Sequence, residues 1–131
     1  MNIFAYGTLQ LPEVMLAVTG REFDSQPARL DNFARHRLRG RSYPGIRPNI
    51  GAWVDALVYL AIDTPSLVLL DAFEDSFYHR ELVKVYTSDG IELEAETYVM
   101  NEDSHHLLMT EAWDLEDFRR NQLHSFLLRH E

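Results

Sequence analysis

Residues 82–99 carry the pattern that most restricts the fold of this chain. From Ile91 to Val99, every second position is apolar or threonine, and three glutamates lie between these positions. A Ser88-Asp89-Gly90 turn separates this stretch from a second strand-like segment at 82–87. A period of two places alternate side chains on opposite faces of a strand. The sequence therefore predicts an antiparallel hairpin with one face toward a core and an acidic face toward water.

Three further strands are expected, at 2–6, 29–38 and 54–62, and the last of these alternates most clearly. Residues 21–27 are expected to form a loop. The stretch 43–49 contains two prolines and a glycine and is expected to form a surface loop. The strands are therefore expected to be short and to be separated by loops, some of which contain proline and glycine.

Three short helices are predicted between and after the strands. The first spans residues 12–18, with a proline at its start and a glycine just after its end. The second runs from Pro65, its first helical position, through Leu67 to Glu74, with Thr64 as its expected N-cap. The third begins after Asp114, its expected N-cap, and carries an apolar stripe. Together these segments predict one α+β domain over residues 1–131, mostly strands.

Length and composition fit a single globular domain with its own core, since the 131 residues are 46% hydrophobic and 25% charged. We expect Trp53 and the C-terminal aromatic residues to lie in that core rather than in an interface. The absence of cysteine excludes a disulfide scaffold, a thiolate zinc site and a cysteine nucleophile. No stretch approaches the roughly 20 apolar residues of a membrane helix, and the N-terminal residues lack a signal-peptide pattern. We therefore expect a cytoplasmic protein with no membrane partner.

The charge pattern gives little support for a nucleic-acid partner or a metal. The net charge of −9 repels polyphosphates at long range. Four arginines alternate along one segment and would share a strand face: Arg35, Arg37, Arg39 and Arg41. A nucleic-acid patch is one interpretation of them, but a solvated face balanced by nearby acids is the better one. The adjacent histidines at 105–106 project in different directions and have no acidic ligand at helical spacing, so no metal site is predicted.

The first candidate site is Tyr6-Gly7-Thr8-Leu9, where the first strand ends. A glycine at this point lets the backbone turn sharply and present successive N–H groups to one point, which suits a carboxylate or a developing oxyanion. An ordinary strand exit would give the same residues.

The second candidate site is the segment Leu70–Arg80, which contains Asp71, Glu74 and Tyr78. At 100° per residue, Asp71 and Glu74 share one face of the predicted helix. Either this face is simply solvated, or it borders a cavity ringed by Tyr78 and its neighbour Phe77. In the second case the aromatic surroundings would raise the basicity of the carboxylate.

Four separated motifs, in order along nearly the whole chain, resemble the γ-glutamyl cyclotransferase-like superfamily, and most closely its AIG2-like branch, which includes γ-glutamylamine cyclotransferases. The N-terminal Tyr-Gly-Thr-Leu motif is the first, and Tyr43-Pro44-Gly45-Ile46 is the second. Leu70-Asp71-Ala72-Phe73-Glu74, followed by Tyr78 and Arg80, is the third. The fourth comprises Tyr98-Val99 and the later Trp113 and Phe118, which resemble the closing strand and final helix.

The resemblance implies a compact mixed β-barrel of about five to seven strands with short helices, and a cofactor-independent enzyme. It implies that Glu74 is the catalytic residue, acting as general base, and that a substrate cradle spans Tyr6, Gly7, Thr8 and Leu9. The reaction would cyclise a γ-glutamyl amide, a small molecule, to 5-oxoproline and release an amine.

Other roles remain open at this stage. Tyr43 and Tyr78 would supply either hydroxyl groups or packed walls to the substrate site. Arg80 is expected to be a structural ion-pair partner and Asp71 a brace. Ala56 and Asp75 depart from the resemblance, since glycine is usual at both positions.

Two alternatives to the cyclotransferase use the same residues. The domain could be a non-catalytic module that binds a γ-glutamyl or amino-acid-like ligand. It could instead be a hydrolase in which Glu74 activates water, which would yield free glutamate. The leaving group and the oligomeric state are not determined by these patterns.

Overall fold

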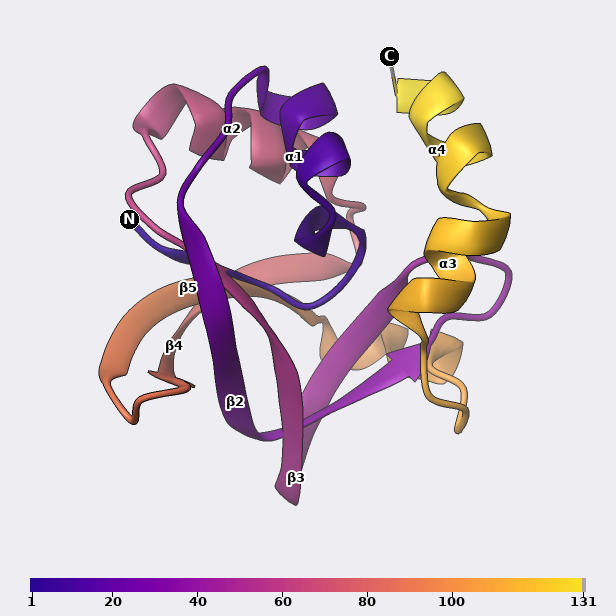
Figure 1. Ribbon diagram of the computed structural model, residues 1–131. Helices are drawn as coiled ribbons and strands as arrows, with labels where there is room; N and C mark the ends of the chain where they lie inside the picture. The colour runs from indigo at the N-terminus through magenta and orange to yellow at the C-terminus, as the bar shows by residue number, and fades with distance from the viewer. Residues whose placement is uncertain (131) are drawn as a thin grey trace.

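The computed structural model describes residues 1–130, and the side chains of residues 1–128. Its five strands close into a barrel in the order β1-β3-β2-β4-β5 (Figure 1). The strands are β1 (Ile3–Ala5), β2 (Ser25–Arg37), β3 (Pro44–Tyr59), β4 (Tyr78–Thr87) and β5 (Glu92–Met100). Neighbouring strands are antiparallel except β1 and β5, which run parallel. The α+β fold and the mixed barrel with short helices are thus confirmed.

The barrel is closed by β1, which is buried on both faces. Phe4 points into a core inside the barrel together with Val58 and Val85. Ile3 and Ala5, on the opposite face, belong to a second core under the helices. Because alternate residues of a strand point in opposite directions, three consecutive apolar residues join two cores.

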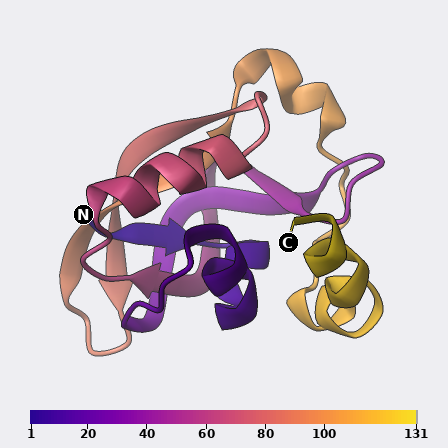
Figure 2. The same cartoon turned by 90° about the horizontal axis from the view of Figure 1, so that it is seen from above.

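The helices cover one end and one side of the barrel. They are α1 (Pro12–Thr19), α2 (Thr64–Phe73), α3 (Leu115–Asn121) and α4 (Leu123–His130), with the 3-10 turns η1 (Thr8–Gln10) and η2 (Glu102–Leu107). Figures 1 and 2 show α1 and α2 side by side at one end, and α3 and α4 in succession at the side. Within residues 1–130, no helix has both the length and the apolar character needed to cross a bilayer.

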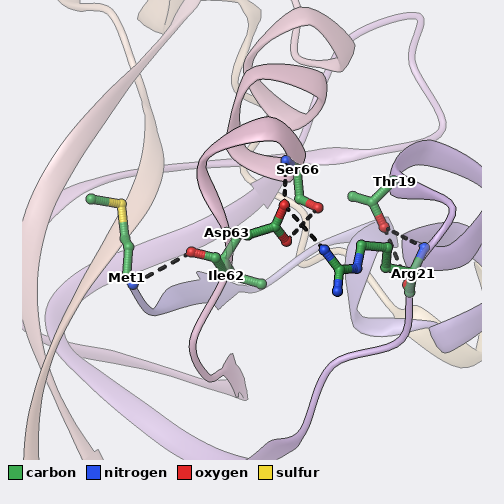
Figure 3. Close-up of polar contacts among 6 residues, drawn as sticks. All are labelled: Met1, Thr19, Arg21, Ile62, Asp63 and Ser66. Atoms are coloured by element: carbon green, nitrogen blue, oxygen red, sulfur yellow. Dashed lines mark hydrogen bonds and ion pairs between the residues drawn. The ribbon is translucent and has the colours of Figure 1, made fainter.

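The start of α2 corrects one prediction. The N-cap is Asp63 rather than Thr64, because the Asp63 carboxylate accepts hydrogen bonds from the Ser66 N–H (3.2 Å) and hydroxyl (2.7 Å). The same carboxylate lies 3.4 Å from the Arg21 guanidinium, just beyond α1 (Figure 3). The terminal amine of Met1 lies 3.5 Å from the Ile62 carbonyl. The end of α1, the start of α2 and the N-terminus are therefore connected.

Two predicted loops are partly strand. The expected loop at 43–49 is the beginning of β3, with Pro44 as its first residue, a position where a strand tolerates proline. Gly45 is buried there, and a Cβ atom would lie 2.7 Å from the Met100 Cγ, so the close approach of β5 requires glycine. The expected loop at 21–27 is shorter because β2 begins at Ser25. The pairing of β2 with β3 extends both strands into these stretches, and local sequence signals do not predict it.

Three other expectations are also corrected. The final helix divides into α3 and α4 at Gln122, whose φ of −133° leaves the helical region, although Asp114 caps it as predicted. Trp53 is 55% exposed rather than in the core, and the Arg29 guanidinium lies 4.9 Å from its ring centroid. β2 ends at Arg37, so the four alternating arginines do not share one strand face. The C-terminal aromatic residues are buried, as expected.

Candidate active site

The turn after β1 presents free backbone donors. Gly7 connects β1 to η1 and packs so closely on β3 that a Cβ atom would lie 3.0 Å from the Pro44 Cδ. Within the described part of the chain, the N–H groups of Gly7, Thr8 and Leu9 have no hydrogen-bond acceptor. Thr8 and Leu9 are buried. Because buried N–H groups are nearly always paired, three successive free donors favour an anionic ligand at this turn.

The carbonyl groups of the same turn are fixed by side chains. The Gln10 amide donates to the Tyr6 carbonyl at 2.9 Å and to the Gly7 carbonyl at 3.2 Å. The Arg35 guanidinium also donates to the Tyr6 carbonyl, at 2.8 Å. These bonds fix the acceptors of the turn, so that its donors remain for a ligand. Gln10 and Arg35 were not predicted to serve the site; Gln10 acts within its own turn, whereas Arg35 reaches the turn from β2.

Glu74 lies at the C-cap of α2 rather than on its helical face. Its backbone has left the helix, with a ψ of 142°, while its N–H donates to the Leu70 carbonyl at 3.1 Å. Burial of Glu74, together with the nearby charges of Asp75 and Asp71, raises its pKa to about 8. The prediction that Asp71 and Glu74 share a helix face is therefore wrong. The predicted rise in basicity agrees with the structure.

The hydroxyl groups of the site tyrosines donate hydrogen bonds to other groups of the protein. Tyr6 donates to the Tyr98 carbonyl at 2.6 Å, and Tyr78 donates to the Pro44 carbonyl at 2.5 Å. The Tyr43 hydroxyl donates to the Asp75 carboxylate. Burial is the main reason why the pKa values of all three site tyrosines, Tyr6, Tyr43 and Tyr78, are raised, to about 12 for Tyr43. In this structure they act as neutral walls, and they hold the cradle, β3 and the Glu74 loop together.

Ion pairs brace the far side of Glu74. Asp71 accepts a hydrogen bond from the Tyr98 hydroxyl at 2.6 Å and lies 3.3 Å from the Arg80 guanidinium. Arg80 also contacts the Glu96 carboxylate at 2.5 Å. Arg80 is thus the ion-pair partner and Asp71 the brace that the sequence predicted. Glu96, expected to face water, is drawn into this network.

All the predicted site residues line one cavity of about 130 Å³. Residues 6–9 form one wall, and Tyr43, Glu74 and Tyr78 form others. Phe77, expected beside Glu74, does not line the cavity; its ring packs 5.0 Å from that of Tyr78. Several other residues that line the cavity were not assigned to the site from the sequence, among them Phe73, Asp75, Tyr98 and Phe126. Phe73 and Tyr98 belong to the motifs described above, and Phe126 belongs to the predicted final helix. Their spacing in the sequence does not indicate that they line the cavity.

Comparison with known proteins identifies the class to which this fold and cavity belong. The family model "Gamma-glutamyl cyclotransferase, AIG2-like" matches residues 3–115. The chain belongs to this family.

Individual relatives agree with this assignment. The chain is 39% identical over 127 residues to AIG2-like protein C of Arabidopsis thaliana, covering 96% of this chain and 73% of the relative. It is 33% identical to AIG2-like protein D of the same plant, covering 96% and 84%. A solution structure of another Arabidopsis thaliana protein has a TM-score of 0.77 at 29% identity, covering 98% of this chain and 86% of that one.

A solved structure described as a gamma-glutamyl cyclotransferase is similar in fold. Its TM-score is 0.68 at 24% identity, and the match covers 76% of this chain and 66% of that one.

Proposed function

We propose that this protein is a γ-glutamyl cyclotransferase that converts a γ-glutamyl amide into 5-oxoproline and a free amine, with Glu74 as general base. Membership of the γ-glutamyl cyclotransferase, AIG2-like family supports the reaction class. The observation that carries the proposal is one cavity that combines a carboxyl group with a pKa of about 8 and a turn with three free N–H groups.

The substrate supplies its own nucleophile. Its α-amine attacks its γ-carbonyl carbon, the new C–N bond closes a five-membered ring, and the original amide C–N bond breaks. Holding the two reacting groups of one molecule in a ring-closing pose contributes on the order of 7–11 kcal/mol, as intramolecular reactions show. No nucleophile from the protein is required, which agrees with a chain that has no cysteine.

Glu74 is matched to the proton that must move. The α-amine attacks only after it loses a proton. Because burial raises the pKa of Glu74 to about 8, accepting this proton costs Glu74 far less free energy than it would cost an ordinary glutamate. Glu74 then returns the proton to the departing nitrogen. An unperturbed glutamate near 4.5 would be too weak a base for this task.

The free N–H groups of residues 7–9 hold the negative charge. They suit the α-carboxylate of the γ-glutamyl unit or the oxyanion that develops on the γ-carbonyl. Tyr6, Tyr43 and Tyr78 line the cavity, and a γ-glutamyl unit packed against them would displace water from the space beside Glu74. Displacement of water favours ring closure over hydrolysis, since both would use the same base.

The test measures 5-oxoproline and free glutamate formed from a panel of γ-glutamyl amides. Glu74→Gln is compared with Glu94→Gln, a matched change at an exposed residue of β5. We expect 5-oxoproline from the wild type, unchanged turnover in Glu94→Gln, and a kcat/KM lower by about 10²–10⁴ in Glu74→Gln. Full turnover by a folded Glu74→Gln protein would contradict the role of Glu74. Free glutamate would indicate a hydrolase, and binding without any product would indicate a binding module.

A further inference from the structure

Arg35 carries a partly buried positive charge that has no acidic partner close by. Its guanidinium donates to the Tyr6 carbonyl at 2.8 Å and lies 5.6 Å from the ring centroid of Trp113. Among the residues that the structure describes, Arg35 forms no ion pair. Asp55 and Asp114 act on its charge from beyond ion-pair distance, and burial is the main reason why the pKa of Arg35 is lowered. The guanidinium has therefore lost part of its hydration without gaining a counter-ion.

The neighbouring groups do not need Arg35 for their own hydrogen bonds. The Gln10 amide donates to the same Tyr6 carbonyl at 2.9 Å. The Trp113 ring is held by its own N–H, which donates to the Ser42 carbonyl at 2.8 Å. An apolar side chain would fill this position at a lower cost in desolvation. Natural proteins depart from such rules mainly at functional sites, so the charge of Arg35 calls for a functional reason.

The peptide group that Arg35 contacts also carries a free donor of the cradle. The Tyr6 carbonyl and the Gly7 N–H belong to one planar trans peptide group, so they point in opposite directions. Arg35 binds one side of this group, and the free Gly7 N–H leaves from the other side. In the next peptide group, the Gln10 amide binds the Gly7 carbonyl and the Thr8 N–H is free. Hydrogen bonds in a chain polarise one another, most strongly where the donor is charged, so both N–H groups become better donors.

We propose that Arg35 is a positioning residue whose charge acts through the Tyr6–Gly7 peptide group and makes the turn at residues 7–9 a site for an anionic oxygen. Arg35 does not line the cavity, so it acts on the ligand through the turn. The anion supplies the negative charge that the protein does not place beside the guanidinium. This arrangement lets a negative group bind in a cavity that also contains Glu74 and Asp75, in a chain with a net charge of −9.

The identity of the anion rests on the proposed function, which offers two anionic oxygens. One is the α-carboxylate of the γ-glutamyl unit, and the other is the oxyanion that develops on the γ-carbonyl. The α-carboxylate is charged in the ground state, so its loss of stabilisation weakens binding. The oxyanion exists only in the transition state, so its loss of stabilisation lowers kcat.

The first measurement compares the binding of 5-oxoproline with that of 5-oxoprolinamide, in which a neutral amide replaces the carboxylate. Dissociation constants are measured by calorimetry for the wild type, Arg35→Gln, Arg35→Lys and Arg47→Gln. Arg35→Gln keeps a hydrogen-bond donor and removes the charge, whereas Arg35→Lys keeps the charge. Arg47 is an exposed arginine of β3 that does not line the cavity, so Arg47→Gln is the matched loss of one charge. We expect the wild type, Arg35→Lys and Arg47→Gln to prefer the acid by about tenfold or more, and this preference to fall toward one in Arg35→Gln.

The second measurement determines kcat and KM for 5-oxoproline formation from a γ-glutamyl amide in the same four proteins. A lost preference with a raised KM and an unchanged kcat assigns the α-carboxylate to the turn. A kept preference with a kcat lower by about tenfold or more in Arg35→Gln assigns the oxyanion. In either case Arg35→Lys should restore at least part of what Arg35→Gln loses, which a purely structural role of Arg35 does not predict.

Urea unfolding controls for the fold. Arg35→Gln should keep the unfolding midpoint of the wild type, because Gln10 still donates to the Tyr6 carbonyl. If Arg35→Gln does not fold, Arg35→Met takes its place, since its apolar side chain can pack against Trp113 without a buried charge.

The two measurements also separate this inference from the proposed function. An Arg35-dependent preference in a protein that forms no 5-oxoproline supports the inference, and only the proposed function fails. Turnover and preference that are both unchanged in Arg35→Gln would overturn the inference alone. An equal loss in Arg47→Gln, or a loss that Arg35→Lys does not restore even in part, would also overturn it. A wild type with neither turnover nor preference would overturn both.

Discussion

The tuned acidity of Glu74 predicts a pH-dependent stability that Glu74→Gln should abolish. The carboxyl group has an ordinary pKa of 4.5 and a folded pKa of about 8, with burial as the main cause. Because the folded value is the higher one, this group stabilises the fold most at low pH, and the contribution is lost as pH rises from about 4.5 through about 8. Glutamine does not titrate, so the variant lacks this loss.

The magnitude follows from the width of the pH interval. Between pH 5.5 and 8.5 the folded state binds more protons at Glu74 than the unfolded state does. Summed over this interval, the difference is about 2.3 pH units, which at 1.36 kcal/mol per unit corresponds to a loss of about 3 kcal/mol in the free energy of unfolding. This is an upper limit, since a half-buried carboxylate keeps part of its hydration. Relative to the wild type, Glu74→Gln should gain up to about 3 kcal/mol across the interval, or about 10 °C in Tm for a domain of this size.

The assay is urea unfolding of wild type, Glu74→Gln and Glu94→Gln at half-unit steps from pH 5.5 to 8.5. All other titrating groups are common to the proteins, so the difference between the wild-type and Glu74→Gln curves isolates Glu74. We expect this difference to grow steadily with pH, while the Glu94→Gln curve runs parallel to that of the wild type. A constant difference between wild type and Glu74→Gln would mean that Glu74 titrates near its ordinary value. The raised pKa of Glu74, on which the proposed proton transfer from the substrate α-ammonium depends, would then be refuted.

Two further predictions concern the barrel itself. Gly45→Ala should destabilise the fold by about 1–3 kcal/mol, because the new methyl group would lie 2.7 Å from the Met100 Cγ and 2.9 Å from its sulfur. In urea unfolding its added cost should shrink in a Met100→Ala background; additive effects would show that this contact is not the cause. Thr97→Val should cost about 1 kcal/mol, since the fully buried Thr97 hydroxyl donates to the Phe4 carbonyl at 2.9 Å. An unfolding midpoint equal to that of the wild type would argue against this contribution.

Much of the fold could be predicted from short-range patterns. The turn at Ser88–Gly90 forms as expected, with the Gly90 N–H donating to the Thr87 carbonyl at 2.9 Å. Proline at the start of α1 and Gly20 in the left-handed region at its end, with a φ of 73°, also follow from the sequence. These features depend on the conformational limits of a few adjacent residues, which the sequence states directly. Family motifs added the barrel, because they summarise long-range pairings that periodicity does not contain.

Long-range contacts corrected the local patterns where the two disagreed. Proline and glycine at 44–45 favour a loop by local rules, yet they lie in β3 because they pair with Arg37 and His36 of β2. Trp53 lies in a clearly alternating strand, but its side chain is on the outside of the barrel, where it is exposed and the Arg29 guanidinium lies over its ring. A period of two tells which residues share a face and not which face is buried.

The sequence by itself predicted the class of fold, the hairpin, the approximate positions of the helices, and part of the set of residues that line the cavity. Only the tertiary structure decided what these residues do for one another. Burial at the end of α2 raises the pKa of Glu74 to about 8, and Arg35, from β2, donates a hydrogen bond to the Tyr6 carbonyl of the cradle. Solvation and electrostatic interactions depend on the distances between residues in space. These distances are set only when the chain folds and the barrel closes.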